Sequence, residues 1–160
     1  MNTIQIQALL INLIIYLFMT TPVMAVSLNK KIYTTKKTFF SSLIYCTIFE
    51  IIFSTILYIF PNAIFSLFTK KTGIINYAIY SSKIIFMSSS LFALKILIPA
   101  NLYNQNKIKK VATFIFTKIA ILIVLIFIFY NLFNTKGILF SFPICDFIFY
   151  VIYILEIIRY

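Results

Sequence analysis

Histidine and tryptophan are absent from this sequence of 160 residues, which also contains only two cysteines, two glycines and three acidic residues. Without histidine, Cys46 and Cys145 cannot form a zinc site of the Cys/His type, and no nucleophile, base and orienting group combine into a catalytic set. Gly73 and Gly137 are too few for a glycine-rich phosphate-binding loop. We therefore expect that the protein is not an enzyme and holds no metal ion or organic cofactor.

Charged residues are also scarce, at 11% of the chain, whereas ordinary globular domains carry roughly 25%. Hydrophobic residues make up 62%, and the mean hydropathy is +1.05. Fourteen basic residues face three acidic ones, but the lysines cluster in short loops between apolar runs. That placement is typical of charges that anchor helices at a membrane surface. We expect an integral membrane protein whose partner is the lipid bilayer and not a nucleic acid.

Long apolar runs divide the chain into five predicted membrane spans within one membrane domain, residues 1–160. The spans are expected at residues 3–26, 38–60, 75–100, 111–133 and 138–158. A helix needs about 20 residues to cross a hydrocarbon core of about 30 Å, and each run is at least that long. None shows the alternation of apolar and polar residues that is typical of a barrel strand. The amphipathic segment 61–72 is too short to cross and is expected at the interface. The predicted fold class is an all-α integral membrane protein with about five transmembrane helices.

The first run has a second interpretation, because Val23-Met24-Ala25 resembles a signal-peptidase site after an apolar stretch. The amino end lacks the basic residues of a secretory signal, and the run is long for one, so a span is preferred.

The lysines of the loops predict the orientation of the spans. Four lysines lie in residues 27–37, two in 61–73, three in 101–110 and one in 131–137. Cytoplasmic loops carry the excess of lysine and arginine, so the first and third loops and the carboxyl terminus are expected in the cytoplasm. We expect a multi-pass protein of a prokaryotic cell membrane.

Polar residues form a stripe on four of the five predicted helices. The stripes comprise Gln5, Asn12 and Tyr16; Thr47, Glu50 and Ser54; Asn76, Tyr80 and Lys83; and Asp146, Tyr150 and Tyr153. Residues three, four and seven positions apart share one helical face. In lipid such a face turns towards the bundle or towards water, so the stripes are either helix contacts or the lining of a solute or ion path.

Two segments resemble the MATE family (multidrug and toxic compound extrusion) of transporters. FNTKGILFSFPICDFIFYVIYILEIIR, residues 133–159, resembles the last helix of that family, and YIFPNAIFSLFTKKTGIINYAIYSSKI, residues 58–84, resembles an earlier helix end and the helix after it. The matching residues of the last helix are Gly137, Ile138, Phe142, Pro143, Ile144 and Asp146, with Phe140 where a tryptophan is usual. The resemblance covers about residues 20 to 160 and corresponds to the eighth to twelfth helices of a twelve-helix transporter.

The resemblance implies an incomplete MATE-like lobe that exports organic cations or drugs against inward protons or sodium ions. Rocking of two lobes gives alternating access, so a second polypeptide or self-association is expected to complete the transporter, and the chain alone is expected to be inactive. The chain departs from the family by lacking its loop glycines and by placing Lys83, Lys95 and Lys118 inside spans. Lys95 and Lys118 lie close enough to helix ends to snorkel. The alternatives are a protein like the lipid-linked saccharide flippases and a non-transporting membrane subunit.

Glu50 and Asp146 are the candidate coupling residues, with a proton or sodium ion as the coupling ion. Glu50 lies nearer the middle of its span, beside Thr47 and Ser54, and a buried carboxylate can exchange a proton for a cation. An ion pair of Glu50 with Lys83 or Lys118 is the alternative. For Asp146 a structural role beside Tyr150 and Tyr153 is preferred, while Gly137 is expected to end the outer loop.

Overall fold

The computed structural model describes the backbone of residues 2–158, and the side chains of these residues except 89–91, 135 and 156–158. All regular structure in this part of the chain is helical. The elements are α1 (Thr3–Ser27), η1 (Lys30–Tyr33), α2 (Lys36–Ile59), α3 (Pro61–Ser66), α4 (Thr72–Ile85), η2 (Phe86–Leu91), α5 (Phe92–Asn104), α6 (Ile108–Phe133) and α7 (Thr135–Ile158).

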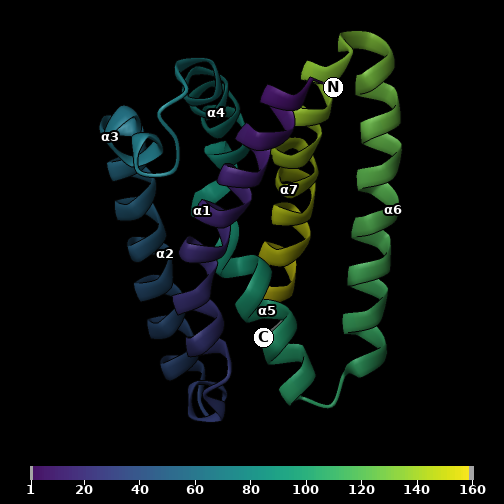
Figure 1. Ribbon diagram of the computed structural model, residues 1–160. Coiled ribbons are helices and arrows are strands. Elements are labelled where there is room, and N and C mark those ends of the chain that lie inside the picture. Colours follow the sequence, from purple (N-terminus) through teal and green to yellow (C-terminus); the bar gives the residue numbers. More distant parts are fainter. Residues whose placement is uncertain (1, 159–160) are drawn as a thin grey trace.

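Four of these helices, α1, α2, α6 and α7, are long and apolar enough to cross a membrane, and α4 with α5 makes a fifth span if the bent pair counts as one. The long segments run alternately down and up through the bundle (Figure 1). Residues 28–35 and 105–107 connect helices at the lower end of that view, and residues 60–71 and 134 at the upper end. An all-helical, multi-pass arrangement is therefore confirmed.

The ends of the spans follow local signals in the sequence. The Thr35 side chain accepts a hydrogen bond from the Thr38 N–H at 3.2 Å and caps the start of α2. Pro61 begins α3 in the first helical turn, where its missing N–H costs little. Near η1, the Tyr33 hydroxyl donates to the Ser27 carbonyl at 2.9 Å, and burial raises the pKa of Tyr33 to about 12. Tyr33 therefore remains a protonated donor that ties this connection to α1.

The turn between α6 and α7 corrects the expectation for Gly137. This glycine lies inside α7, and Asn134 alone makes the turn with a positive φ of 54°. A Cβ on Gly137 would collide with the main-chain carbonyl of Phe129, so the glycine permits the close approach of two helices. Its role is architectural, as the sequence suggested, but it acts in packing and does not end a loop.

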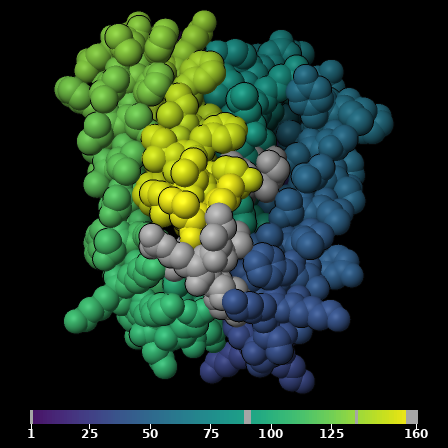
Figure 2. All heavy atoms as spheres, turned by 180° about the vertical axis from the view of Figure 1, so that it is seen from behind, coloured from purple at the N-terminus to yellow at the C-terminus, as the bar shows by residue number. Residues whose placement is uncertain are grey.

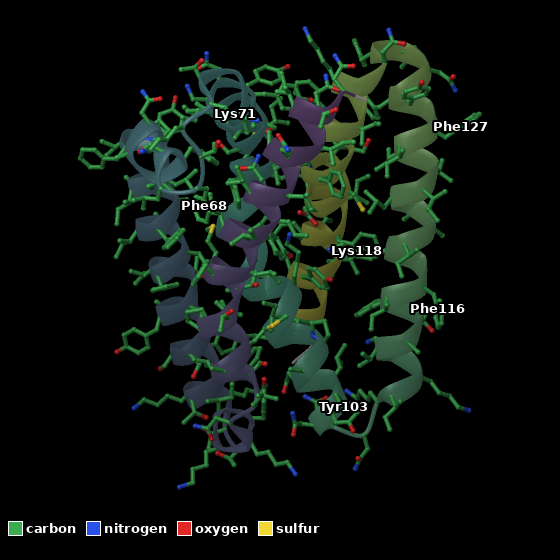
Figure 3. The ribbon with its side chains drawn as sticks, in the orientation of Figure 1. Phe68, Lys71, Tyr103, Phe116, Lys118 and Phe127 are labelled. Atoms are coloured by element: carbon green, nitrogen blue, oxygen red, sulfur yellow. The ribbon has the colours of Figure 1, made fainter. Side chains whose placement is uncertain are left out.

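Apolar residues cover the outside of the bundle, while several polar residues are buried. No described residue of α6 is buried, and Phe116 and Phe127 point outwards from it (Figure 3). Seen from behind, α6 stands along one edge beside α7 (Figure 2). The buried polar residues are Asn12, Thr20, Glu50, Ser81, Ser82, Ser88, Asn101, Ser141 and Asp146. A lipid-facing exterior around a partly polar interior is the pattern expected of a membrane bundle.

Two apolar clusters hold the helices together. One joins α1, the end of α2, α3 and α4, and it includes Met19, Phe65 and Ala78. The other joins the start of α2, α5 and α7, and it includes Leu97 and Phe149. The first cluster extends through Phe86 of η2 to Phe92 at the start of α5, so the two clusters meet along this broken span.

Candidate functional site

The third predicted span is not one continuous helix. Its two halves, Thr72–Ser88 and Phe92–Asn104, are bent by 45° relative to each other, with the 3-10 segment η2 around the bend. The sequence there is FMSSSL, and serine side chains compete for backbone hydrogen bonds within helices. A break in a helix leaves N–H groups at the start of the second half without intrahelical partners. In lipid these groups need another acceptor.

Glu50 supplies that acceptor from α2. Its Oε2 accepts a hydrogen bond from the Ala93 N–H at 2.8 Å, in the first turn of α5, and the residue is fully buried. A carboxylate at a helix N-terminus is favoured by the partial positive charge of the first turn. The second carboxylate oxygen, Oε1, is also buried and has no hydrogen-bond partner among the described residues. Glu50 therefore holds the half-helix with one oxygen and leaves the other available.

Asp146 binds the same broken segment from α7. Its Oδ2 accepts hydrogen bonds from the Ser88 hydroxyl at 2.9 Å and from the Lys95 ammonium at 2.6 Å. The Lys118 ammonium lies 3.0 Å from Oδ1, and in Figure 3 Lys118 lies between α6 and α7. One carboxylate thus joins η2, α5, α6 and α7. Such a hydrogen-bonded, multiply paired aspartate is a fixed anion.

The charges of this cluster balance within the described residues. Asp146 faces two ammonium groups, Lys95 and Lys118, and Lys95 also lies 3.9 Å from the Phe92 ring centroid. Glu50 holds the same half-helix at Ala93, two residues before Lys95. With all four groups ionised the sum is zero, which lowers the cost of burying them. A proton or sodium ion bound to Glu50 would leave the cluster with one positive charge. A change of charge on Glu50 would therefore alter the charge balance around the lysines.

The predicted partners of the two acids are corrected by this geometry. Lys118 pairs with Asp146 and not with Glu50, and Lys83 lies 5.4 Å from the centroid of the Tyr58 ring. Lys95 and Lys118 do not snorkel, because their ammonium groups turn inwards to the carboxylate. These pairs are set by contacts between helices. The periodicity of residues within one helix gives no information on such contacts.

The four residues predicted to accompany the acids lie close in sequence but make other contacts. The Thr47 hydroxyl donates to the Leu43 carbonyl at 2.8 Å, and the Ser54 hydroxyl to the main-chain carbonyl of Glu50 at 2.7 Å. Tyr153 is buried with its ring edge-on to Phe114, and the half-buried Tyr150 packs against the same apolar cluster. The two tyrosines therefore contribute to packing around Asp146.

The polar residues predicted to face the bundle from the third span do not face it. Asn76, Tyr80 and Lys83 are exposed, whereas Ser81 and Ser88 on another face are buried. Asn12 of α1, which was expected to face the bundle, donates to the Ser81 hydroxyl at 2.8 Å and to the Ala78 carbonyl at 3.2 Å. The seven-residue spacing of Ser81 and Ser88 was the available signal for this face, because such residues align on a helix.

Chemically, the site is a broken helix held between two carboxylates. Asp146 is paired through both oxygens, and Glu50 has one oxygen without a described partner. The described partners of the two acids are a backbone N–H, a serine hydroxyl and two ammonium groups, and this arrangement suits charge compensation. Comparison of the chain with protein-family models, curated proteins and solved structures found no match.

Proposed function

We propose that this chain is part of an ion-coupled efflux transporter of the MATE type, in which Glu50 takes up the coupling proton or sodium ion. One observation carries the proposal: a fully buried carboxylate caps the second half of a broken span with one oxygen and keeps its other oxygen without a described partner. In membrane transporters, discontinuous helices of this kind form substrate and coupling-ion sites.

Ion binding at Glu50 would change how firmly α5 is held. The ionised carboxylate makes a charge-assisted hydrogen bond to the Ala93 N–H, and such bonds are roughly twice as strong as neutral ones. A proton or sodium ion on Glu50 neutralises that charge and weakens the bond to the half-helix. The position of α5 relative to α2 and the occupancy of Glu50 would then depend on each other, which is the thermodynamic requirement for coupling.

Asp146 serves a different purpose in this proposal. Its two ammonium partners hold it ionised and tie α5 to α6 and α7. With this contact fixed, release of α5 from Glu50 moves the half-helix towards the α6–α7 side instead of detaching it from the bundle. Asp146 is thus a structural anchor, and Glu50 is the coupling group.

The exported compound would be an organic cation or drug, as the resemblance to MATE transporters implies. Alternating access needs two lobes around a central site, and the four or five candidate spans of this chain would supply part of one lobe. We propose that a second polypeptide or a second copy of this chain supplies the facing surface. The protein would work in the cell membrane of a prokaryote, with its carboxyl terminus in the cytoplasm.

The test is gradient-driven efflux of a cationic dye from proteoliposomes that contain this chain together with the amino-terminal half of a MATE transporter. We expect one of two imposed gradients, of protons or of sodium ions, to drive efflux. Vesicles that contain only one of the two polypeptides should show background rates. If the combination shows no gradient-driven efflux, the transporter proposal is wrong and a non-transporting subunit is the better account.

Glu50→Gln isolates the coupling group, because the amide oxygen can still accept from the Ala93 N–H while the exchangeable charge is lost. We expect wild-type yield and a monodisperse protein, but efflux reduced to background. Tyr45→Phe is a matched control on the same helix: the residue is 73% exposed, and efflux should be unchanged. Wild-type efflux by the Gln variant would refute the role of Glu50.

A further inference from the structure

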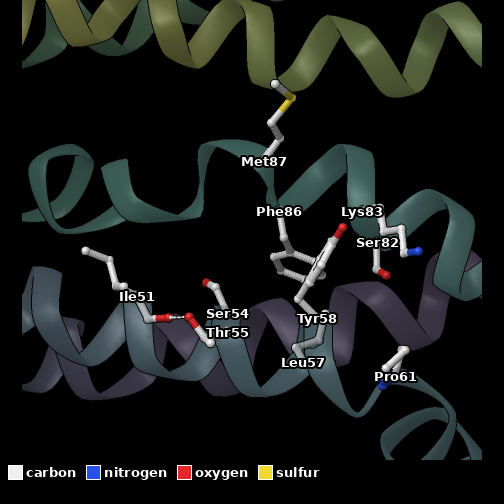
Figure 4. Close-up of a pocket in the computed structure, with 10 residues that line it drawn as sticks. All are labelled: Ile51, Ser54, Thr55, Leu57, Tyr58, Pro61, Ser82, Lys83, Phe86 and Met87. Carbon is white, nitrogen blue, oxygen red and sulfur yellow. Dashed lines mark hydrogen bonds between the residues drawn. The ribbon is translucent and has the colours of Figure 1, made fainter.

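A pocket of about 390 Å³ lies between α2 and the α4–η2 segment, and neither Glu50 nor Asp146 is among its lining residues. Its volume falls within the range of about 300–1,000 Å³ that is usual for small-molecule sites. Apolar side chains, among them Ile51, Leu57 and Phe86, form much of its lining. Lys83 and Tyr58 lie in the half of the pocket nearer Pro61, and Ile51 lies at the opposite end (Figure 4). The pocket is therefore amphipathic along its length.

The hydroxyl groups of the lining residues are already engaged as donors within their own helices. Ser82 donates to the Ile79 carbonyl at 2.9 Å, and Thr55 donates to the Ile51 carbonyl at 2.7 Å. Each hydroxyl has a single proton, so these groups offer a ligand no further donor. Donor capacity in the pocket comes from the Lys83 ammonium and the Tyr58 hydroxyl instead.

Lys83 has no compensating carboxylate in the described part of the chain. Its ammonium forms no salt bridge there and lies over the Tyr58 ring, 5.4 Å from the centroid. Glu50 and Asp146 are committed to α5 and to the other lysines. A lysine within an apolar span needs a partner or water, since an isolated charge is costly in hydrocarbon.

We propose that this pocket binds an amphiphile with a single negative charge, whose head group contacts Lys83 and Tyr58 and whose acyl chain lies on Ile51, Leu57 and Phe86. One ammonium compensates one anionic charge, and the neutral Tyr58 hydroxyl can donate to the same oxygen atoms. Tyr58 is the next-to-last residue of α2, so the head group would lie near the membrane boundary with the chain directed inwards. This direction matches that of a lipid in the leaflet on the α3 side.

Fluorescence quenching tests the proposal, because the sequence has no tryptophan and one introduced indole reports alone. The reporter is Ile51→Trp, at the acyl end of the pocket, in vesicles of chain-brominated phosphatidylglycerol or phosphatidylcholine. Ile51 is 47% exposed, so an indole can be accommodated there. We expect the anionic lipid to associate about fivefold more strongly than the zwitterionic one, the effect of about one lysine on anionic lipid.

Three matched variants test whether the preference for the anionic lipid arises at Lys83. Lys83→Gln should abolish it, whereas Lys71→Gln, which removes the same charge at the start of α4, should retain it. A reporter at the outward-facing Phe116 (Phe116→Trp) should show no preference. Equal quenching by the two lipids at Ile51→Trp, or a preference that survives Lys83→Gln, would overturn the proposal.

The source of the anionic head group is distinguished by competition. An unbrominated fatty acid above its ionisation pH, or unbrominated phosphatidylglycerol, is added to the Ile51→Trp protein bound to brominated phosphatidylglycerol. Relief of quenching by the fatty acid at lower concentration identifies a free carboxylate as the preferred ligand, and the reverse identifies a phosphodiester lipid. Equal relief by the fatty acid, phosphatidylglycerol and phosphatidylcholine would show that the pocket does not select charge, and would overturn the proposal.

Discussion

Replacing Asp146 by asparagine should destabilise the bundle strongly. Asp146→Asn removes the charge that compensates both Lys95 and Lys118, while the side chain keeps its size and can still accept from Ser88. Removing one partner of a buried ion pair typically costs about 3–5 kcal/mol, because the other charge is left uncompensated. Lys95 should account for most of this loss, because its side chain is 11% exposed, whereas that of Lys118 is 27% exposed and can turn outwards.

The assay is reversible unfolding of the detergent-solubilised protein in a denaturing surfactant, followed by circular dichroism. We expect the free energy of unfolding to fall by about 3 kcal/mol or more in Asp146→Asn, and to recover by at least half in Asp146→Asn combined with Lys95→Met. Lys118→Gln alone should cost about 1 kcal/mol, as expected of a partly exposed pair. A loss below about 1 kcal/mol in Asp146→Asn, or no recovery in the double variant, would refute the reasoning that this aspartate compensates a buried lysine.

Three further predictions concern packing and topology. Gly137→Ala should destabilise the protein by about 1–3 kcal/mol because its Cβ meets the Phe129 carbonyl, whereas Gly73→Ala, whose nearest neighbour is the Ile4 side chain at 3.8 Å, should be close to neutral in the same unfolding assay. Asn12→Ala should cost about 0.6–1.7 kcal/mol through loss of the bonds to Ser81 and Ala78, and no measurable loss would contradict the buried contact. In a chain with Cys46→Ala and Cys145→Ala, an impermeant thiol reagent on intact cells should label Asn134→Cys but not Asn104→Cys, and the reverse pattern would overturn the predicted orientation.

The spans were predictable because their length and hydropathy are local properties. Predicted spans 3–26, 38–60 and 111–133 differ by at most three residues at each end from α1, α2 and α6. The span predicted at residues 75–100 was wrong in its continuity, since it begins at Thr72, breaks at η2 and ends at Asn104. Serine is only moderately unfavourable in a helix, so the sequence FMSSSL did not by itself signal a break.

The candidate site was predictable in its acids but not in their partners. Glu50 and Asp146 stood out because carboxylates are costly in apolar spans. Which groups meet them depends on how α5 lies between α2 and α7, and this packing brings Ala93 to one acid and Lys95 to the other. Helical periodicity shows which residues share a face of one helix. It does not show how one helix is positioned against its neighbours.

The one-residue turn at Asn134 has a consequence for the biogenesis of the protein. A lysine or an aspartate at the centre of a lone inserting helix costs about 2.5–3.5 kcal/mol on translocon scales. Lys118 and Asp146 lie on the two arms of the α6–α7 hairpin and pair across it. Because so short a connection brings the arms together as soon as both have been synthesised, they can leave the translocon as one unit whose opposite charges already compensate each other.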